Sequence, residues 1–228
     1  MNVRATVQAT VQATVQATVQ LDPHNLLSVR FSERYGSHYG AAQQSRRVFV
    51  EGGGVLRHDS PRVLEVGFGL GLNWRTTLEA LDGDALDYHA YEAYPLSAAE
   101  LAGVAPGERH PLWLALLDGW DAAVMAGHLD LAHGAQRLRI DFIDATTAPL
   151  PRVWAHAVYL DGFSPARNPE LWTPDFLARL ASSLAPGGRL ATYSAAGHVR
   201  RGLMAAGLTV ERCHGLVGKR EFLVAHKQ

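Results

Sequence analysis

The feature that most constrains the fold is a short apolar run that ends in closely spaced glycines. Residues 62–66 read RVLEV, and such a run of branched apolar residues predicts a buried strand. Three glycines follow at alternate positions, namely Gly67, Gly69 and Gly71. Residues 72–81 then carry leucines that fit one face of a helix. This combination predicts a ligand site, because glycines let a ligand approach the main chain and a helix start presents free N–H groups.

The spacing of the glycines indicates which ligand the loop takes. A dinucleotide-binding loop reads G-x-G-x-x-G, but here Leu72 takes the place of its third glycine, which disfavours a nicotinamide dehydrogenase. The loop reads G-x-G-x-G and is preceded by an acid, Glu65. In this it resembles the S-adenosylmethionine loop of class I methyltransferases. A tight turn that binds no ligand is the alternative interpretation.

Acidic residues stand at the ends of the strands expected next. Residues 87–92 predict a strand ending at Glu92, near the place where an acid accepts hydrogen bonds from ribose hydroxyls. Two later strands are expected to end at Asp144-Ala145 and at Asp161. Because parallel strands end at one edge of a sheet, these side chains are expected to share one crevice. The predicted cofactor-binding residues are Glu65, Gly67, Phe68, Gly69, Gly71, Asn73, Glu92, Asp144, Ala145 and Asp161.

Strands alternate with helices through the centre of the chain. This order predicts an α/β fold with a mostly parallel, Rossmann-like sheet and helices on both faces. The further strands are expected at residues 137–143, 156–160, 190–194, 209–213 and 221–225. The further helices are expected near residues 97–101, 110–127, 174–184 and 197–206. Residues 186–188, Pro-Gly-Gly, are expected to stop the third of these helices, and the last two strands are expected to pair, which gives an antiparallel terminal strand.

The chain is predicted to divide into three parts. Residues 1–20 contain four Ala-Thr-Val-Gln repeats and are expected to be a low-complexity tail. Residues 21–60 are expected to hold a small N-terminal β-hairpin around Asp-Pro-His-Asn at 22–25, followed by a substrate-side segment with a short helix at 40–50. Residues 61–228 are expected to form the methyltransferase domain.

The composition is that of an ordinary globular protein, with 228 residues, 47% hydrophobic and 19% charged. No apolar run is long enough to cross a membrane, and no Cys/His spacing resembles a metal site. The single cysteine, Cys213, excludes an internal disulfide and fits a cytoplasmic protein. The net charge of -1 conceals a basic end, since residues 198–228 carry six Lys/Arg against two Asp/Glu.

The most specific run in the chain is YLDGFSPARNPELW at residues 159–172. It strongly resembles the methylating domain of the bacterial tRNA 5-methylaminomethyl-2-thiouridine enzymes, which carry a near-identical L-D-G-F-x-P-x-x-N-P-x-x-W run. The resemblance includes the glycine loop and covers about residues 32–225. It implies the class I methyltransferase fold, with S-adenosyl-L-methionine as cofactor and tRNA as partner.

The implied reaction is N-methylation of the 5-aminomethyl group of uridine or 2-thiouridine at the tRNA wobble position, giving 5-methylaminomethyl-(2-thio)uridine. Many members of the family also carry a flavin-dependent oxidase domain. Because this sequence ends at Gln228, the methylation step alone is expected, with a separate enzyme supplying the aminomethyl-uridine. The alternatives are a methyltransferase that acts on another amine and a non-catalytic RNA-binding module on the same fold.

Asp161 is the expected catalytic residue, because a carboxylate in the pocket can hold the substrate amine and accept its proton. Its alternative role is that of a turn former before Gly162. Phe163 and Pro165 are expected to wall the pocket, and Phe163 can stack on a base. The residues expected to contact phosphates of the RNA are Arg46, Arg200, Arg201, Lys219 and Arg220. The predicted substrate-binding residues are Ser32, Tyr35, Arg46, Phe163, Pro165, Arg200, Arg201, Lys219 and Arg220.

Overall fold

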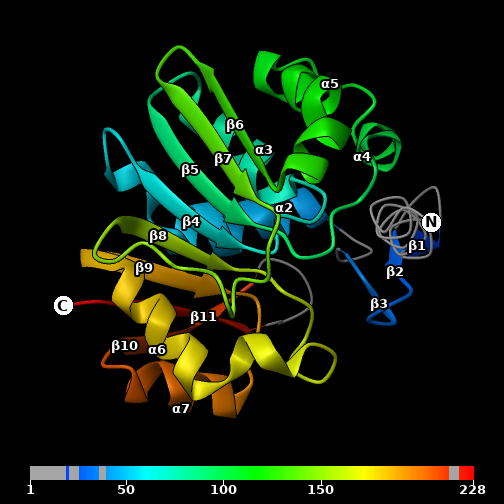
Figure 1. The fold of residues 1–228 in the computed structure, drawn as a ribbon. Helices are drawn as coiled ribbons and strands as arrows, with labels where there is room; N and C mark the ends of the chain where they lie inside the picture. Colours follow the sequence, from blue (N-terminus) through cyan, green and yellow to red (C-terminus); the bar gives the residue numbers. More distant parts are fainter. Residues whose placement is uncertain (1–18, 21–25, 36–39, 216–220) are drawn as a thin grey trace.

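A computed structural model describes residues 19–20, 26–35, 40–215 and 221–228 of the chain. Within these residues, one large sheet forms the centre of the molecule (Figure 1). Its strands are, in order across the sheet, β10 (Thr209–His214), β11 (Glu221–His226), β9 (Leu184–Thr192), β8 (Ala155–Leu160), β4 (Arg62–Val66), β5 (Leu86–Tyr91), β7 (Gln136–Asp141) and β6 (His128–His133).

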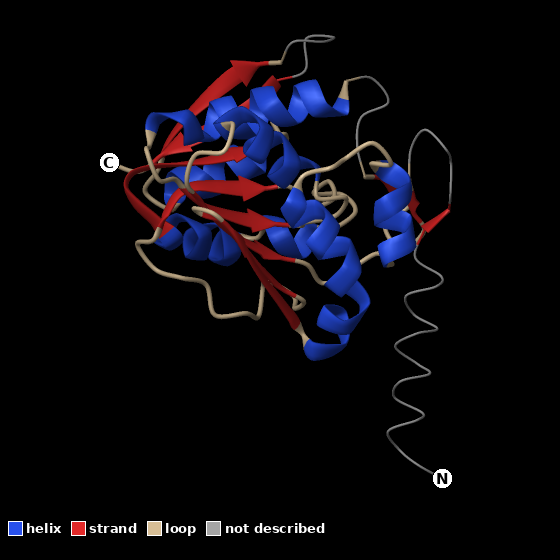
Figure 2. Cartoon of the chain, turned by 90° about the horizontal axis from the view of Figure 1, so that it is seen from above, coloured by secondary structure: helices blue, strands red, loops and turns tan. Residues whose placement is uncertain are grey.

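Helices cover both faces of this sheet, which is clear when the molecule is seen from above (Figure 2). The α-helices are α2 (Ala41–Ser45), α3 (Leu72–Leu81), α4 (Ala98–Val104), α5 (Pro111–Ala126), α6 (Pro174–Ser183) and α7 (Gly197–Ala205). Shorter helical turns are the π-helix η1 (Arg46–Glu51) and the 3-10 helices η2 (Val55–Arg57) and η3 (Pro169–Trp172). The predicted α/β fold with helices on both faces is confirmed.

The central strands are parallel, and their register sets where the site forms. Val66 at the end of β4 pairs with Tyr91 of β5 and with Leu160 of β8. The residues that follow these strands, including Glu92 and Asp161, therefore emerge at the same edge of the sheet. Strand β11 runs antiparallel between β9 and β10, which confirms the expected antiparallel terminal strand. Strand β6, which pairs antiparallel with β7, was not predicted.

Two hydrophobic cores lie on opposite faces of the sheet, because successive strand residues point to opposite sides. On one face, Val63 and Tyr159 pack with helices α3, α4 and α5. On the other face, Leu64 and Val158 pack with helices α6 and α7. The run RVLEV is thus buried on both sides, as a continuous apolar run predicts for a central parallel strand.

Strand β9 begins earlier in the chain than the sequence predicts. Residues 186–188 were expected to stop a helix before a strand at 190–194, but α6 ends at Ser183 and β9 begins directly at Leu184. The Pro-Gly-Gly run lies inside the strand, beside an irregularity in the pairing with β8. A Cβ atom on Gly188 would lie 2.9 Å from the carbonyl oxygen of Ala155, so this glycine permits the close approach of the two strands.

The N-terminal region forms a small antiparallel sheet beside the main one. Its strands are β1 (Val19–Gln20), β2 (Leu27–Ser28) and β3 (Glu33–Arg34). The predicted hairpin corresponds to β1 and β2, while β3 was not foreseen. The predicted helix at 40–50 appears as α2 continued by the π-helix η1. Most of the repeat tail and the Asp-Pro-His-Asn turn lie outside the described residues, and the predicted three-part division remains a prediction.

Candidate active site

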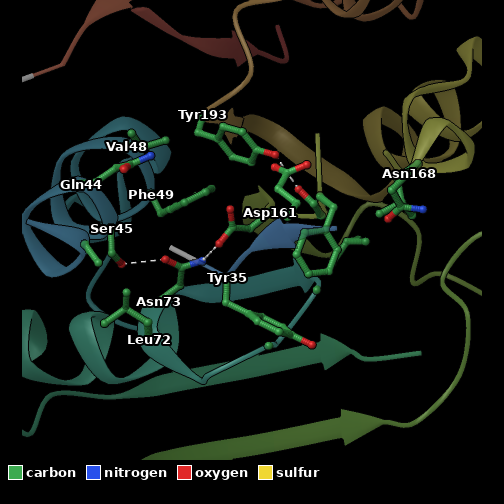
Figure 3. A pocket seen from close by; sticks show the side chains of 18 of the residues that line it. Tyr35, Gln44, Ser45, Val48, Phe49, Leu72, Asn73, Asp161, Asn168 and Tyr193 are labelled. Atoms are coloured by element: carbon green, nitrogen blue, oxygen red, sulfur yellow. Dashed lines mark hydrogen bonds between the residues drawn. The ribbon is translucent and has the colours of Figure 1, made fainter. Parts of the chain in front are cut away.

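A cavity of about 880 Å³ opens at the carboxyl ends of the central strands. Its walls come from the glycine loop, from the ends of β5, β7 and β8, from the run after β8, and from the N-terminal region. Figure 3 shows this cavity with Asp161 near the centre and Asn73 between Asp161 and Ser45. Of the predicted residues, those that line it are Gly67, Gly69, Asn73, Glu92, Asp144, Ala145, Asp161, Tyr35 and Phe163.

The glycine loop needs glycine for its backbone conformation. Gly67, Gly69 and Gly71 have φ angles of 90°, 52° and 64°, in the left-handed region that other residues rarely adopt. A Cβ atom on Gly67 would lie 2.8 Å from the carbonyl oxygen of Asp161, so the loop passes directly against the end of β8. The loop therefore brings bare backbone to the floor of the cavity.

Glu92 connects this loop to the end of β5. Its carboxylate accepts hydrogen bonds from the backbone N–H of Gly69 at 2.8 Å and from that of Tyr94 at 2.7 Å. Burial raises the pKa of Glu92, and these two backbone donors oppose the rise. The carboxylate is thus held in a fixed position in the cavity wall, where its remaining lone pairs can accept hydroxyl groups of a ligand.

Asp144 and Ala145 follow β7 at the same edge of the sheet. One carboxylate oxygen of Asp144 accepts from the backbone N–H of Thr146 at 2.8 Å and from its hydroxyl at 2.7 Å. This local turn orders the segment that brings Asp144, Ala145 and Ile143 to the cavity. The predicted position of this pair is therefore in agreement with the structure.

Asp161 follows β8 and is partly buried in the cavity. Its Oδ2 accepts a hydrogen bond of 2.6 Å from Nδ2 of Asn73. Burial raises the pKa of Asp161 to about 7, because removal from water disfavours the charged carboxylate, while the hydrogen bond from Asn73 opposes the rise. A carboxyl group with such a pKa can both hold and release a proton at neutral pH.

Three predicted cofactor residues lie behind the cavity wall. Glu65 is fully buried and bonds to Asn73 and to the hydroxyl of Tyr88. Phe68 is also buried and packs between Trp74 and Trp120. Gly71 leaves room for Phe68, whose ring lies 3.0 Å from the place of a Cβ atom. These three residues support the loop from behind the cavity wall, and their predicted role in cofactor binding remains a prediction.

The substrate side of the cavity is built from aromatic side chains of distant segments. The ring of Phe163 stacks on Phe31 with 4.5 Å between centroids and meets Tyr35 edge-on at 5.1 Å. Both Phe31 and Tyr35 belong to the N-terminal region, which thereby packs on the run after β8. One face of Phe163 is thus already covered by the protein.

A carboxylate joins the same two segments. Glu33 of β3 accepts a hydrogen bond of 2.6 Å from the hydroxyl of Ser164 and two of 3.2 Å from its backbone N–H. Trp172 is buried and donates its indole N–H to the carbonyl oxygen of Phe163 at 3.0 Å. The run after β8 is therefore fixed from both sides.

Five other predicted substrate residues belong to the described part of the chain and are absent from the cavity wall. Ser32 and Arg46 are exposed, and Arg46 lies 4.0 Å from Glu51. Pro165, Arg200 and Arg201 are also absent from the cavity wall, the last two on helix α7. Lys219 and Arg220 lie outside the described residues. The contacts of the five basic residues to phosphates remain a prediction, and so do contacts of Ser32 and Pro165 with the substrate.

Several residues of the cavity were not predicted. Tyr193 follows β9 and donates its hydroxyl to the carbonyl oxygen of Gly162 at 2.9 Å. It stands at the same sheet edge as the acids, so the strand-end rule could have found it. Ser45 fell in the N-terminal segment that carried the resemblance but was given no role. Glu33 lies 131 residues from Ser164, and no local pattern in the sequence indicates that contact.

The sequence profile of one protein family, described as S-adenosyl-L-methionine-dependent methyltransferase, matches residues 108–228. The chain belongs to this family. The methyltransferase is also 38% identical over 208 residues to the tRNA 5-methylaminomethyl-2-thiouridine biosynthesis bifunctional protein MnmC of Aromatoleum aromaticum, covering 85% of this chain and 32% of that protein. It is 40% identical over 209 residues to the MnmC protein of Paracidovorax citrulli, covering 86% of this chain and 33% of that protein.

The methyltransferase spans about a third of the length of these curated relatives. Among solved structures, it is similar to MnmC2 of Aquifex aeolicus, with a TM-score of 0.69 and 25% identity over 88% of this chain and 66% of that chain. It shares its fold with spermidine synthase of Thermotoga maritima at a TM-score of 0.54 and 11% identity, covering 92% of this chain and 72% of that one. The predicted class I methyltransferase fold is thereby confirmed.

The residues of the methyltransferase fit its cofactor, S-adenosyl-L-methionine. This molecule combines a ribose, an adenine and an amino-acid tail, and has no phosphate. The cavity offers the matching donors and acceptors, namely the bare backbone at Gly67 and Gly69 and the fixed carboxylate of Glu92. Its volume is also in the range of small-molecule sites. Among the residues that the structure describes, no helix is both long and apolar enough to cross a membrane.

Proposed function

We propose that this methyltransferase methylates the 5-aminomethyl group of uridine or 2-thiouridine at the tRNA wobble position, giving the 5-methylaminomethyl product. The observation that carries the proposal is the place of Asp161. Its carboxylate stands in one cavity with the glycine loop, within the run that resembles the tRNA-modifying enzymes. The names of the relatives, which refer to tRNA 5-methylaminomethyl-2-thiouridine biosynthesis, support the same substrate.

The chemistry of the amine explains why a carboxylate is needed. A primary alkylamine has a lysine-like pKa of about 10.4, so at neutral pH it is mostly an ammonium ion without a free lone pair. S-adenosylmethionine, when bound, supplies an electrophilic methyl group. Asp161 then has two tasks, which are to hold the ammonium group by a charge-assisted hydrogen bond and to accept its proton. Its pKa of about 7 suits a base that works near neutral pH.

The rest of the cavity suits a cationic amine attached to a base. Acidic residues outnumber basic ones in its lining, with Arg34 and Arg47 against Glu33, Glu92, Asp144, Asp161, Glu170 and Glu221. Such an acidic wall attracts a positively charged group. The aromatic side chains around Phe163 offer a flat apolar surface to the uracil ring.

The proposed partner is tRNA, and the proposed place of action is the cytoplasm. A separate enzyme would supply the aminomethyl-uridine. The basic residues Arg200, Arg201, Lys219 and Arg220 are the proposed contacts to the RNA backbone, which would make binding weaker as salt concentration rises. A methyltransferase that acts on another amine is the second candidate, because an acidic cavity attracts any alkylammonium ion.

The test is a methylation assay with the purified protein, S-adenosylmethionine and tRNA that carries 5-aminomethyl-uridine. Nucleosides are then separated and identified by mass spectrometry. We expect 5-methylaminomethyl-uridine with the wild type and a strongly reduced yield with Asp161→Ala. A free diamine offered under the same conditions tests the second candidate. Methylation of the diamine with none of the tRNA would replace the proposed substrate, and binding of tRNA without any methylation would indicate a non-catalytic module.

A further inference from the structure

The amide of Asn73 connects the carboxylate of Asp161, in the cavity, with that of Glu65, behind the cavity wall. Asn73 is the second residue of α3 and is 4% exposed. Its Nδ2 donates to Oε1 of Glu65 at 2.8 Å and to Oδ2 of Asp161 at 2.6 Å. Its Oδ1 accepts from the hydroxyl of Ser45 at 2.7 Å, so the amide is held on both ends (Figure 3). An amide nitrogen has two hydrogens, and both are used here.

The register of the sheet explains why two carboxylates meet at this point. Glu65 stands one residue before Val66, which pairs with Leu160, the residue before Asp161. Like charges so close oppose each other, and no ion pair with either carboxylate occurs among the described residues. Glu65 is fully buried, and burial raises its pKa well above the ordinary value. Asp161, which lines the cavity, therefore ionises more readily than Glu65.

We propose that Asn73 is a positioning residue, whose amide, fixed by Ser45 and Glu65, orients the carboxylate of Asp161 and favours its ionised form for proton transfer. The inference rests on the proposed function, because it assigns Asp161 the role of base. The hydrogen bond to Asp161 becomes stronger when the carboxylate is charged. Donation from Ser45 polarises the amide and strengthens it further. Because the amide is already held, it does not need to reorganise when the proton moves.

This assignment differs from the cofactor contact that the sequence predicts for Asn73. The side chain does line the cavity. A hydrogen bond from its Nδ2 to a ligand, however, would require one of the two carboxylates to lose its donor. The existing contacts therefore favour a role for Asn73 in orienting Asp161. The cofactor would then depend on Gly69 and Glu92 rather than on Asn73.

The experiment compares the pH dependence of single-turnover methylation in the wild type and in Asn73→Ala. Asn73→Ala removes the hydrogen bond to the charged carboxylate of Asp161. This loss should move the midpoint of the pH profile upward by about one to two pH units. The rate at pH 7 should therefore fall by roughly five- to fiftyfold and recover partly at pH 9. Affinity for S-adenosylmethionine, measured by calorimetry, should change far less.

Thr77→Val is the matched control. Thr77 lies one turn further along α3, is fully buried, and bonds to the backbone carbonyl of Asn73 and to Tyr159 rather than to a carboxylate. This variant should lose stability without moving the midpoint. A lower rate in Asn73→Ala with an unchanged midpoint would overturn the proposal and make Asn73 a packing residue.

Two further measurements keep the test decisive. In Ser45→Ala the amide keeps its donors but loses its fixed orientation, so a smaller upward shift of the midpoint is expected. If Asn73→Ala does not fold, no shift in Ser45→Ala would overturn the proposal. The pKa of Asp161 can also be measured by NMR of carboxyl carbons in the protein without substrate. A rise in that pKa in a protein that methylates no tRNA would sustain the role of Asn73 and reject only the proposed function.

Discussion

The two halves of the cavity are held together in different ways. In the cofactor half, the glycine loop, Glu92 and Asp144 follow strands β4, β5 and β7, and the register of the parallel sheet brings them together. Backbone N–H groups hold Glu92 in place. In the substrate half, the N-terminal region and the run after β8 meet through the aromatic contacts of Phe163 and the hydrogen bonds of Glu33.

This difference has a functional consequence. The cofactor half depends on backbone geometry, so few sequences satisfy it. The substrate half depends on side chains that contact each other across long sequence distances, and such contacts can change without disturbing the sheet. A substrate preference can therefore evolve while the cofactor site stays the same. Asp161 belongs to both halves, because it follows β8 and contacts Asn73 from the glycine-loop side.

The largest expected effect is at this shared residue. General bases contribute about 10²–10⁴-fold to a rate, so Asp161→Ala should lower the single-turnover rate of methylation by that order. Asp161→Asn keeps a polar group but cannot accept the proton, and should recover partly at high pH as the free amine becomes abundant. Affinity for S-adenosylmethionine should change little. A near-normal rate in Asp161→Ala would reduce Asp161 to a turn former and leave the two halves without a shared catalytic group.

The second effect should separate the halves. Gly69→Val puts a β-branched residue at a φ of 52° and disturbs the N–H that holds Glu92. Calorimetry should then detect no binding of S-adenosylmethionine, while tRNA binding in a filter assay should persist. Gly134→Val is the matched control, because Gly134 has a φ of 57° and nothing within 4 Å of its missing Cβ atom. Equal loss of cofactor binding in both variants would indicate general misfolding.

The sequence predicts the cofactor half much better than the substrate half. Glu92, Asp144 and Asp161 follow apolar strands, and the rule that parallel strands end together is enough to group them. The pattern shows an acid two residues before a glycine but not the direction of its side chain, and Glu65 lies in the core, where it bonds to Tyr88. The buried position of Phe68 could not be predicted for the same reason.

The substrate half could be predicted only in part. Tyr35 and Phe163 were found by resemblance, but their contact with each other and with Phe31 depends on how a distant segment packs. No periodicity, spacing or motif in the sequence indicates the hydrogen bond between Glu33 and Ser164. The start of β9 was also missed, because Pro-Gly-Gly normally marks a break and here fits an irregular strand pairing.

The third effect concerns the substrate half alone. Glu33→Ala removes the acceptor for the hydroxyl and backbone N–H of Ser164, and hydrogen bonds to charged groups contribute about 1.5–3 kcal/mol before solvent weakens them. We expect the apparent affinity for tRNA to fall by up to roughly tenfold, with unchanged affinity for S-adenosylmethionine. Ser164→Ala should reproduce part of this loss. Strictly additive effects in the double variant would show that the two residues do not act together.

The last effect concerns stability rather than catalysis or binding. The dependence of the melting temperature on pH tests whether the pKa of Asp161 is raised in the folded protein. Burial raises the pKa of Asp161 from its ordinary value of 3.8 to about 7. Between these pH values the folded protein keeps a proton that the unfolded chain has released, so this group makes the protein less stable as pH rises from about 4 to about 7, and the loss stays constant above that pH. Asparagine cannot ionise. The gap between the two pKa values corresponds to about 4 kcal/mol, so Asp161→Asn should raise the melting temperature of the cofactor-free protein at pH 8 by on the order of ten degrees, on the scale of about 2–4 °C per kcal/mol. At pH 4 the two proteins should melt at nearly the same temperature.

Asp59→Asn, a substitution of an exposed residue, serves as the control and should show no such dependence of the melting temperature on pH. An equal difference between wild type and Asp161→Asn at both pH values would mean that Asp161 ionises normally in the fold, and the cavity would then lack a base tuned to neutral pH.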